Sequence, residues 1–242
     1  GDTARLPYGV KSKKLVIQYS NQIVKFLIRK NAKMIIVACN TATAMALEEL
    51  KYNFKDTPII GVIEPGSIQA SLDSINKKIG VIGTAATIKS GAYEHALKAI
   101  DNNIDVFSKD CPLFVPFVEE GMIEGEAINL IVEHYLSSFK NDIDTIILGC
   151  THYPLLEPVI KKYVKDIKLV DSASAVAKYA NMILDERKIK NGYKRICQKT
   201  DISPTIAMNG SEYLNYLETS NVDEDTYPVT VAYTHLPLPP KA

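Results

Sequence analysis

The stretch MIIVACNT at residues 34–41 has a counterpart in TIILGCTH at residues 145–152. Each is a continuous apolar run, typical of a strand buried on both faces, and each leads into a cysteine and a threonine. The other short apolar or β-branched runs are at 59–63, 79–82, 104–107 and 168–170. Longer amphipathic stretches separate these runs, and strands alternating with helices predict βαβ units and a mostly parallel sheet. The chain is therefore assigned to the α/β class.

The amphipathic stretches predict helices between the strands. They lie at 11–31, 42–53, 67–76, 87–101, 122–140, 155–165 and 173–188. Ligands of open parallel sheets bind at the carboxyl ends of the strands, so the residues after each apolar run matter most. The repeated strand–cysteine–threonine unit predicts two similar α/β halves, each presenting one cysteine to a shared cleft.

Composition excludes several classes of protein. The 242 residues carry 28 basic and 28 acidic side chains, so no charge excess attracts nucleic acid or an acidic membrane surface. No apolar run reaches the roughly 18 residues of a membrane-spanning helix, and the polar start GDTAR does not resemble a signal peptide. We therefore expect a cytoplasmic protein. The four cysteines show no zinc spacing, so no metal site is expected, and Cys111 and Cys197 are read as buried apolar residues.

Cys39 and Cys150 are candidates for reactive thiols. A cysteine at the entrance of a helix meets the amides of the first turn and the helix dipole, which favour the thiolate and lower its pKa. The alternative is that both cysteines fill core space while their neighbours cap helices. Both interpretations can hold together, because a helix N-terminus binds anions with the same groups. The side chains able to donate to a substrate carboxylate are Asn40, Thr41, Thr84, Thr87 and Thr151.

Two more side chains could join this site. His152 follows Cys150 by two residues, so both could reach one pocket, although a single histidine is often structural. Glu119 follows the segment CPLFVPFV at 111–118, where a solvated helix start is the alternative. The sequence has no Walker loop, GxGxxG, HExxH or GxSxG pattern, so nucleotide, zinc and serine-hydrolase chemistry lack support.

Five motifs, in order, resemble the signatures of glutamate racemases within the aspartate/glutamate racemase family. They are GDTARLPYG at 1–9, ACNTA at 38–42, IGTAAT at 82–87, VPFVE at 115–119 and LGCTHYP at 148–154. The resemblance covers about residues 1–220. Related aspartate racemases typically carry an acidic residue where His152 stands, which favours glutamate as substrate.

The resemblance implies two α/β domains with the active site in the cleft between them. The first domain would comprise 1–62 plus 172–222 and the second 63–171. The remaining segment, 223–242, would lie outside the fold, since AYTHLPLPPKA at 232–242 resembles nothing in the family and is rich in proline.

The implied activity is cofactor-independent interconversion of L- and D-glutamate, which supplies D-glutamate for peptidoglycan. Racemisation removes the α-proton from one face and delivers a proton to the other, so two bases fixed on opposite faces suit it. Cys39 and Cys150 would be these bases, with His152 as the partner of Cys150. Glu119 is carried over by resemblance alone. The substrate would be held by Pro7, Tyr8 and Gly9 together with the donors named above.

Other functions stay open at this point. A non-catalytic protein that binds acidic metabolites would keep the donors without needing two cysteines. A hydrolase using Cys150 and His152 would leave Cys39 without a role. An aspartate racemase would share the paired cysteines. The oligomeric state is also open, with a homodimer among the alternatives.

The sequence departs from the family pattern at its start. Members normally open with a strand ending in Asp-Ser-Gly, whose aspartate assists one cysteine and whose serine contacts substrate, and this sequence begins after that motif. We therefore expect the chain as given to be a poor catalyst and less stable than a complete relative.

Overall fold

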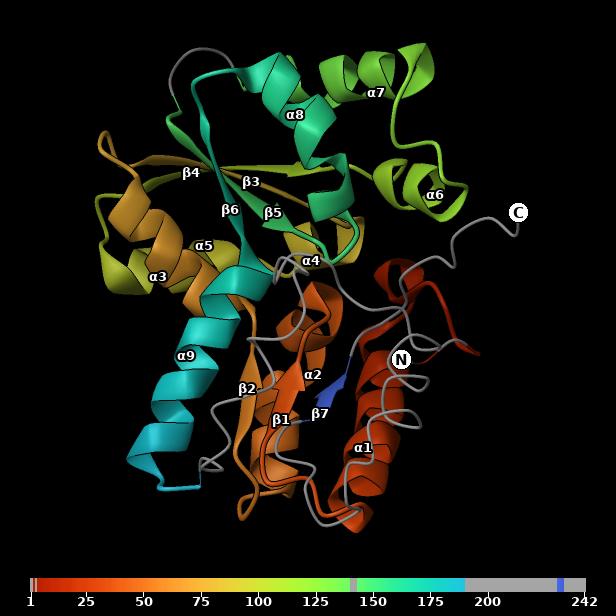
Figure 1. The fold of residues 1–242 in the computed structure, drawn as a ribbon, viewed down its shortest axis with the longest axis vertical. Coiled ribbons are helices and arrows are strands. Elements are labelled where there is room, and N and C mark those ends of the chain that lie inside the picture. The colour runs from red at the N-terminus through yellow and green to blue at the C-terminus, as the bar shows by residue number, and fades with distance from the viewer. Residues whose placement is uncertain (1, 3, 140–142, 190–229, 233–242) are drawn as a thin grey trace, which may run out of the picture.

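The computed structural model describes residues 2, 4–139, 143–189 and 230–232. Two parallel sheets lie one above the other, with α4 (Ala85–Lys89) between them (Figure 1). The α/β class with mostly parallel sheets, predicted from the alternating pattern, is confirmed. No helix in the described ranges is both long and apolar enough to cross a bilayer.

The lower sheet has the strand order β2-β1-β7 within the described residues, and all neighbours are parallel. Its strands are β1 (Ile35–Val37), β2 (Ile59–Gly61) and β7 (Thr230–Ala232). The helices α1 (Lys13–Arg29) and α2 (Asn40–Asn53) pack on one face, and α9 (Ser172–Glu186) packs on the other. Because both faces are covered, Ile35, Ile36 and Val37 are all buried, as the unbroken apolar run predicts.

The upper sheet has the order β4-β3-β5-β6, again fully parallel. Its strands are β3 (Lys78–Gly83), β4 (Asp105–Asp110), β5 (Thr145–Gly149) and β6 (Lys168–Asp171). One face is covered by α6 (Phe114–Glu119), α7 (Glu126–Leu136) and α8 (Glu157–Val164). The other face is covered by α3 (Ile63–Asp73) and α5 (Ala92–Ile100). The short 3₁₀ helices η1 (Tyr8–Val10) and η2 (Tyr153–Leu156) lie at the carboxyl side of the sheets.

All six apolar runs form strands, β1 to β6, but the predicted helices differ in three places. The helix predicted at 67–76 begins at Ile63, because Pro65 is tolerated in a first turn. The helix predicted at 87–101 is two helices, since Gly91 adopts the left-handed conformation with φ of 67° between α4 and α5. Helix α6 was not predicted, because Pro112 just before it and Pro116 within its six residues obscure the helical period.

The expectation that 223–242 lies outside the fold is wrong for Thr230–Ala232. These residues form β7 and pair in parallel with β1, with Ile36 opposite Val231. An exposed edge of a parallel sheet can accept any extended segment, because pairing needs backbone groups and not a particular sequence. The rest of that segment, and Cys197, lie outside the described residues. We keep the proposed division into a first domain, 1–62 plus 172–222, and a second domain, 63–171. Strands β1 and β2 belong to the first domain, and strands β3 to β6 belong to the second.

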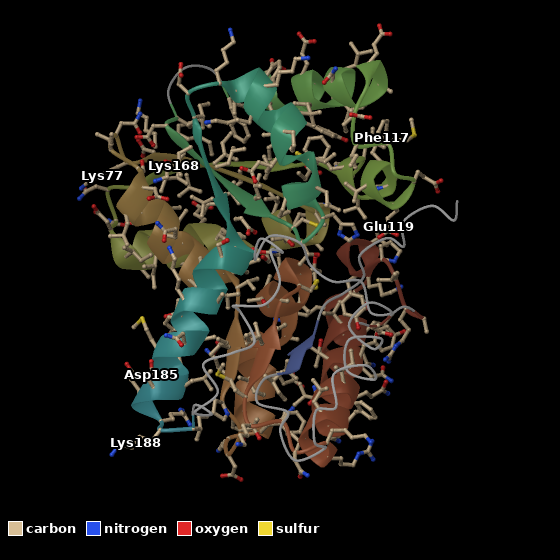
Figure 2. All side chains as sticks on the ribbon, in the orientation of Figure 1. Lys77, Phe117, Glu119, Lys168, Asp185 and Lys188 are labelled. Carbon is tan, nitrogen blue, oxygen red and sulfur yellow. The ribbon has the colours of Figure 1, made fainter. Side chains whose placement is uncertain are left out.

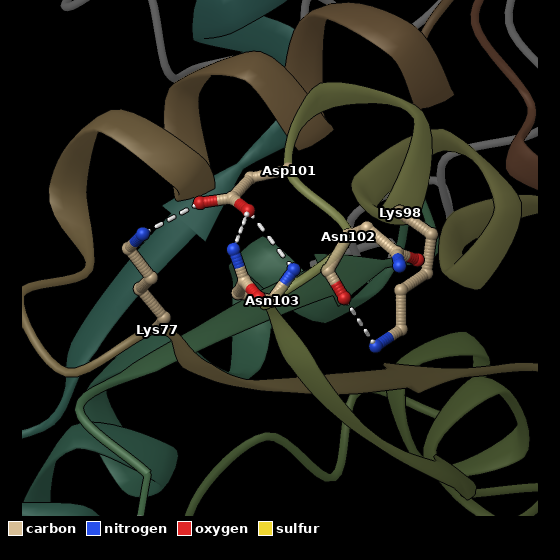
Figure 3. Close-up of polar contacts among 5 residues, drawn as sticks. All are labelled: Lys77, Lys98, Asp101, Asn102 and Asn103. Atoms are coloured by element: carbon tan, nitrogen blue, oxygen red, sulfur yellow. Dashed lines mark hydrogen bonds and ion pairs between the residues drawn. The ribbon is translucent and has the colours of Figure 1, made fainter.

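Tight turns close the ends of the upper sheet that lie away from the carboxyl termini of the strands. Between α5 and β4, the Asp101 carboxylate accepts hydrogen bonds from the backbone and side-chain nitrogens of Asn103, at 2.9 and 3.0 Å (Figure 3). Lys77, just before β3, forms a 2.6 Å ion pair with the same carboxylate. These turns close the amino ends of the strands, so the carboxyl ends of the strands are left free for a binding site.

Candidate active site

The carboxyl ends of three strands from the two sheets meet around one cavity. Cys39 follows β1 of the lower sheet, while Thr84 and Cys150 follow β3 and β5 of the upper sheet. All three line a cavity of about 340 Å³ between the sheets. Its size falls within the range of small-molecule sites. The shared cleft expected from the repeated unit is therefore present, with one cysteine from each half.

Nearly all the site residues proposed from the sequence line this cavity. They are Pro7, Tyr8, Gly9, Cys39, Asn40, Thr41, Thr84, Glu119, Cys150, Thr151 and His152. Thr87 is not a lining residue, because it lies one layer behind, with its hydroxyl 3.1 Å from that of Thr41. The lining residues without a predicted role are Leu6, Val10, Ala85, Pro112, Val115 and Pro116. These are apolar, so no chemical signal in the sequence distinguishes them from core residues.

Cys39 occupies the N-cap position of α2. Its Sγ accepts a hydrogen bond from the backbone amide of Ala42 at 3.4 Å, and the side chain is 8% exposed. The free amides and the dipole of a 14-residue helix therefore converge on this sulfur. This is the environment that the sequence predicted, and it favours negative charge on Sγ.

Cys150 has a different environment. The residues after it form a turn and then η2, so no α-helix begins at this sulfur. Burial raises the pKa of Cys150 to about 12, although hydrogen bonds from the His152 backbone amide and the Thr151 hydroxyl oppose the rise. The prediction that a helix entrance lowers the pKa of both thiols is thus wrong for Cys150. The raised pKa favours the protonated thiol at Cys150.

His152 connects Cys150 to Glu119. Its Nδ1 lies 3.7 Å from the Sγ of Cys150, and its Nε2 lies 2.6 Å from Oε1 of Glu119 at the end of α6. Figure 2 shows Glu119 where α6 faces the lower half of the molecule. An ionised carboxylate can only accept, so Nε2 donates to Glu119, and in the neutral imidazole the Nδ1 lone pair then faces the thiol. The three side chains form a continuous path for a proton.

Three threonine hydroxyls meet beside the cavity. The Oγ1 atom of Thr41, on α2, lies 3.0 Å from that of Thr84 and 3.1 Å from that of Thr87, and the last two are 3.0 Å apart. Thr84 caps α4 by accepting from the Thr87 amide. Hydroxyls in such a ring can rotate from one another toward a ligand, so the cluster offers adjustable donors to a carboxylate.

The loop before η1 is held by the buried carboxylate of Asp2. Asp2 accepts from the Tyr8 hydroxyl at 2.5 Å and forms an ion pair with the Arg5 guanidinium at 2.8 Å. The guanidinium also lies 4.3 Å from the ring centroid of Tyr19 on α1. These contacts fix Pro7, Tyr8 and Gly9 against the cavity. Sequence reasoning missed Asp2 and Arg5, because their role lies in supporting a loop and not in touching the cavity.

Comparisons with known proteins point to one family. The family model described as Asp/Glu/Hydantoin racemase matches residues 4–180. The chain is 56% identical to the glutamate racemase of Aquifex aeolicus over 178 residues, which cover 74% of this chain and 69% of that protein. It is 46% identical to the glutamate racemase of Hydrogenobaculum sp. over 219 residues, covering 90% of this chain and 81% of the relative.

Among solved structures, the chain is similar to glutamate racemase from Francisella tularensis in complex with D-glutamate. The TM-score is 0.76 at 36% identity, with 94% of this chain and 87% of that chain covered. The match extends over nearly the whole of this chain, so the fold agrees with that of a solved glutamate racemase. On these grounds the chain belongs to the Asp/Glu/Hydantoin racemase family.

Proposed function

We propose that this protein interconverts L-glutamate and D-glutamate by a two-base mechanism without a cofactor. The observation that carries the proposal is the presence of Cys39 and Cys150 in one cavity, on strand ends that belong to different sheets. The similarity to proteins named glutamate racemase supports the choice of substrate. The D-glutamate complex of the Francisella tularensis relative supports it further.

Two bases on opposite walls match what racemisation requires. One base removes the α-proton from one face of the carbon while the other delivers a proton to the opposite face. Each reacting atom needs to lie about 3 to 3.5 Å from the α-carbon in a reactive pose. We therefore expect the two sulfurs to lie roughly 6 to 9 Å apart when substrate is bound.

The environments of the two thiols would set their opposite roles. Cys39, with the α2 amides on its sulfur, is suited to act as the base, and Cys150, whose pKa is raised by burial, is suited to act as the acid. For the other enantiomer the roles reverse, and Cys150 must first lose its proton. His152 Nδ1 is placed to take that proton, and Glu119 would stabilise the imidazolium that forms.

Polar groups around the cavity would hold the substrate. Asn40, Thr41, Thr84 and Thr151 are neutral donors suited to carboxylates, and Thr87 would support Thr41 and Thr84 from behind. Donors to the α-carboxylate also stabilise the negative charge that develops when the α-proton leaves. Pro7, Tyr8 and Gly9 would line the cavity beside these donors, since Gly9 lies against Thr84.

The proposed biological role is the supply of D-glutamate for peptidoglycan in the cytoplasm. Three cysteines of the described residues, Cys39, Cys111 and Cys150, are free thiols, as suits a reducing compartment.

We also propose a homodimer. Exposed apolar side chains on two elements next to the cavity, Val10 of η1 and Leu113 before α6, support this assembly, and analytical ultracentrifugation of the purified protein tests it.

The test of the activity is α-proton exchange in deuterated water. The protein is incubated separately with L-glutamate, D-glutamate and L-aspartate, and the α-proton signal is followed by NMR while optical rotation is followed in parallel. We expect both glutamate enantiomers to lose the α-proton as they racemise, with far slower exchange of aspartate. Binding of glutamate without exchange would support a non-catalytic binding protein instead. Faster exchange of aspartate would make the protein an aspartate racemase.

A further inference from the structure

Tyr93 lies between the two strand ends that carry the cysteines. It sits in the first turn of α5, is 2% exposed, and packs in the core under the upper sheet. A Cβ atom added to Gly149 would lie 3.1 Å from Cε2 of Tyr93 and 2.6 Å from the Ile82 carbonyl oxygen. The tyrosine ring therefore rests directly against the residue that precedes Cys150, at a position that only glycine fits.

The hydroxyl of Tyr93 reaches the other strand end. It donates a hydrogen bond of 2.6 Å to Oδ1 of Asn40, the residue that follows Cys39, across 53 positions of sequence. Ser172, the first residue of α9, approaches the same hydroxyl from a third element. One side chain thus contacts both cysteine-bearing turns, with its ring on one and its hydroxyl on the other.

This hydrogen bond fixes the orientation of the Asn40 amide. The Tyr93 hydroxyl donates its proton to Oδ1, so the amide cannot flip without breaking the bond and placing its NH₂ group against that proton. The opposite atom, Nδ2, is fully buried and has no hydrogen-bond partner among the described residues. Leaving a buried donor unsatisfied is costly, and Asn40 lines the cavity, so a carboxylate that settles next to Asn40 would satisfy Nδ2.

We propose that Tyr93 is a positioning residue that orients the Asn40 amide toward the substrate and holds the two cysteine-bearing turns at a fixed separation. The inference rests on the proposed function and assigns a role to a residue outside the cavity lining. Tyr93 touches no reacting atom and acts through Asn40 and Gly149. The hydroxyl and the ring of Tyr93 have separable effects. The hydroxyl orients the Asn40 amide, and the ring supports the backbone at Gly149.

The variant Tyr93→Phe removes the hydroxyl and keeps the ring. We expect about a tenfold rise in KM for both glutamate enantiomers and a matching loss of D-glutamate affinity by calorimetry, since one net hydrogen bond is worth about a factor of ten. The turnover number should change much less, because the thiols keep their positions. Tyr135→Phe is the matched control, since its buried hydroxyl accepts from the Leu113 amide away from Asn40, and it should leave KM unchanged.

A double-mutant cycle with Asn40→Ala separates positioning from a merely structural role. If Tyr93 acts through Asn40, then adding Tyr93→Phe to Asn40→Ala should cause no further loss of D-glutamate affinity. Additive losses, or a Tyr93→Phe variant with parental KM and affinity, would overturn the inference. Absence of glutamate exchange by the parent protein would contradict the proposed function instead, and the affinity cycle would still decide the role of Tyr93.

Discussion

The imidazole Nε2 of His152 lies 2.6 Å from the Oε1 of Glu119, although 33 residues separate the two in sequence. The contact joins the C-terminal end of α6 to the turn after β5, so it depends on how α6 packs on the upper sheet. Glu119 thereby sets which nitrogen of His152 faces Cys150. The acid–base behaviour of one thiol therefore depends on a side chain from a distant element.

Replacing Glu119 tests this dependence. In Glu119→Gln the negative charge that fixes the imidazole tautomer is lost while the side-chain size is kept. We expect the turnover number to fall by about 10²-fold or more, within the range for general acid–base assistance, with little change in KM. The primary isotope effect with α-deuterated glutamate should rise mainly for the enantiomer whose proton Cys150 removes.

The neighbouring Glu120 provides the matched control. It is exposed beside Glu119, so Glu120→Gln changes the same net charge without touching His152. It should racemise glutamate at the parental rate. A Glu119→Gln variant that is as active as Glu120→Gln would remove Glu119 from the mechanism.

The two cysteines should be individually essential. Cys39→Ala and Cys150→Ala each leave one face of the substrate without a proton donor or acceptor, so racemisation should drop to the background rate. Calorimetry should still detect D-glutamate binding, because the carboxylate donors remain. Cys111→Ala is the control: Cys111 is fully buried in the core of the upper half, so its loss should lower the melting temperature and spare activity. Near-parental racemisation by either of the first two variants would show that its cysteine is structural.

Asp2 should act on substrate binding through Tyr8. In Asp2→Asn the ion pair with Arg5 is lost, which weakens the support of the loop that carries Pro7, Tyr8 and Gly9. We expect KM for glutamate to rise roughly three- to tenfold, equivalent to about 1 kcal/mol, with the turnover number nearly unchanged. Glu48→Gln breaks an exposed ion pair on α2 and should have no effect, so equal KM values for the two variants would argue against a role for Asp2.

Asp144 should make stability depend on pH. Its carboxylate accepts from the Ser74 hydroxyl and from the amides of Ile75 and Asn76, at 2.6, 2.7 and 2.8 Å, and so holds the turn between α3 and β3. Burial raises the pKa of Asp144, but these hydrogen bonds outweigh burial and hold it below its ordinary value. A lowered pKa in the folded state means that the contribution is present above about pH 4, the unfolded value, and is lost as pH falls through the folded value.

Urea denaturation of Asp144→Asn measures this contribution. At pH 7 we expect a loss of about 1–3 kcal/mol in the free energy of unfolding, the range for hydrogen bonds to a charged group. The difference from the parent should shrink as pH falls below about 4, where the unfolded parent carboxylate takes up a proton, and it should be lost once the folded carboxylate is protonated too. Asp101→Asn, at the exposed turn of Figure 3, should cost less because solvent screens its ion pair. A pH-independent difference for Asp144→Asn would show that its charge is not the cause.

The sequence by itself determined strands β1 to β6 and the placement of the two cysteines. Residues 34–38 and 145–148 are apolar without interruption, and such runs form strands that helices cover on both faces. Because Cys39 and Cys150 directly follow these runs, their positions at the carboxyl ends required no knowledge of distant contacts. Local pattern was sufficient for these features, since strand formation and the order of residues along a strand are both local properties.

Tertiary structure alone decided the raised pKa of Cys150, the contact of Glu119 with His152, the hydrogen bond from Tyr93 to Asn40, and the pairing of β7 with β1. The sequence predicted a lowered pKa for Cys150 from a helix that does not begin there, and burial gives the opposite result. Desolvation, hydrogen-bond partners and strand neighbours depend on which distant segments pack together. These interactions act through space, so spacing along the chain carries little information about them.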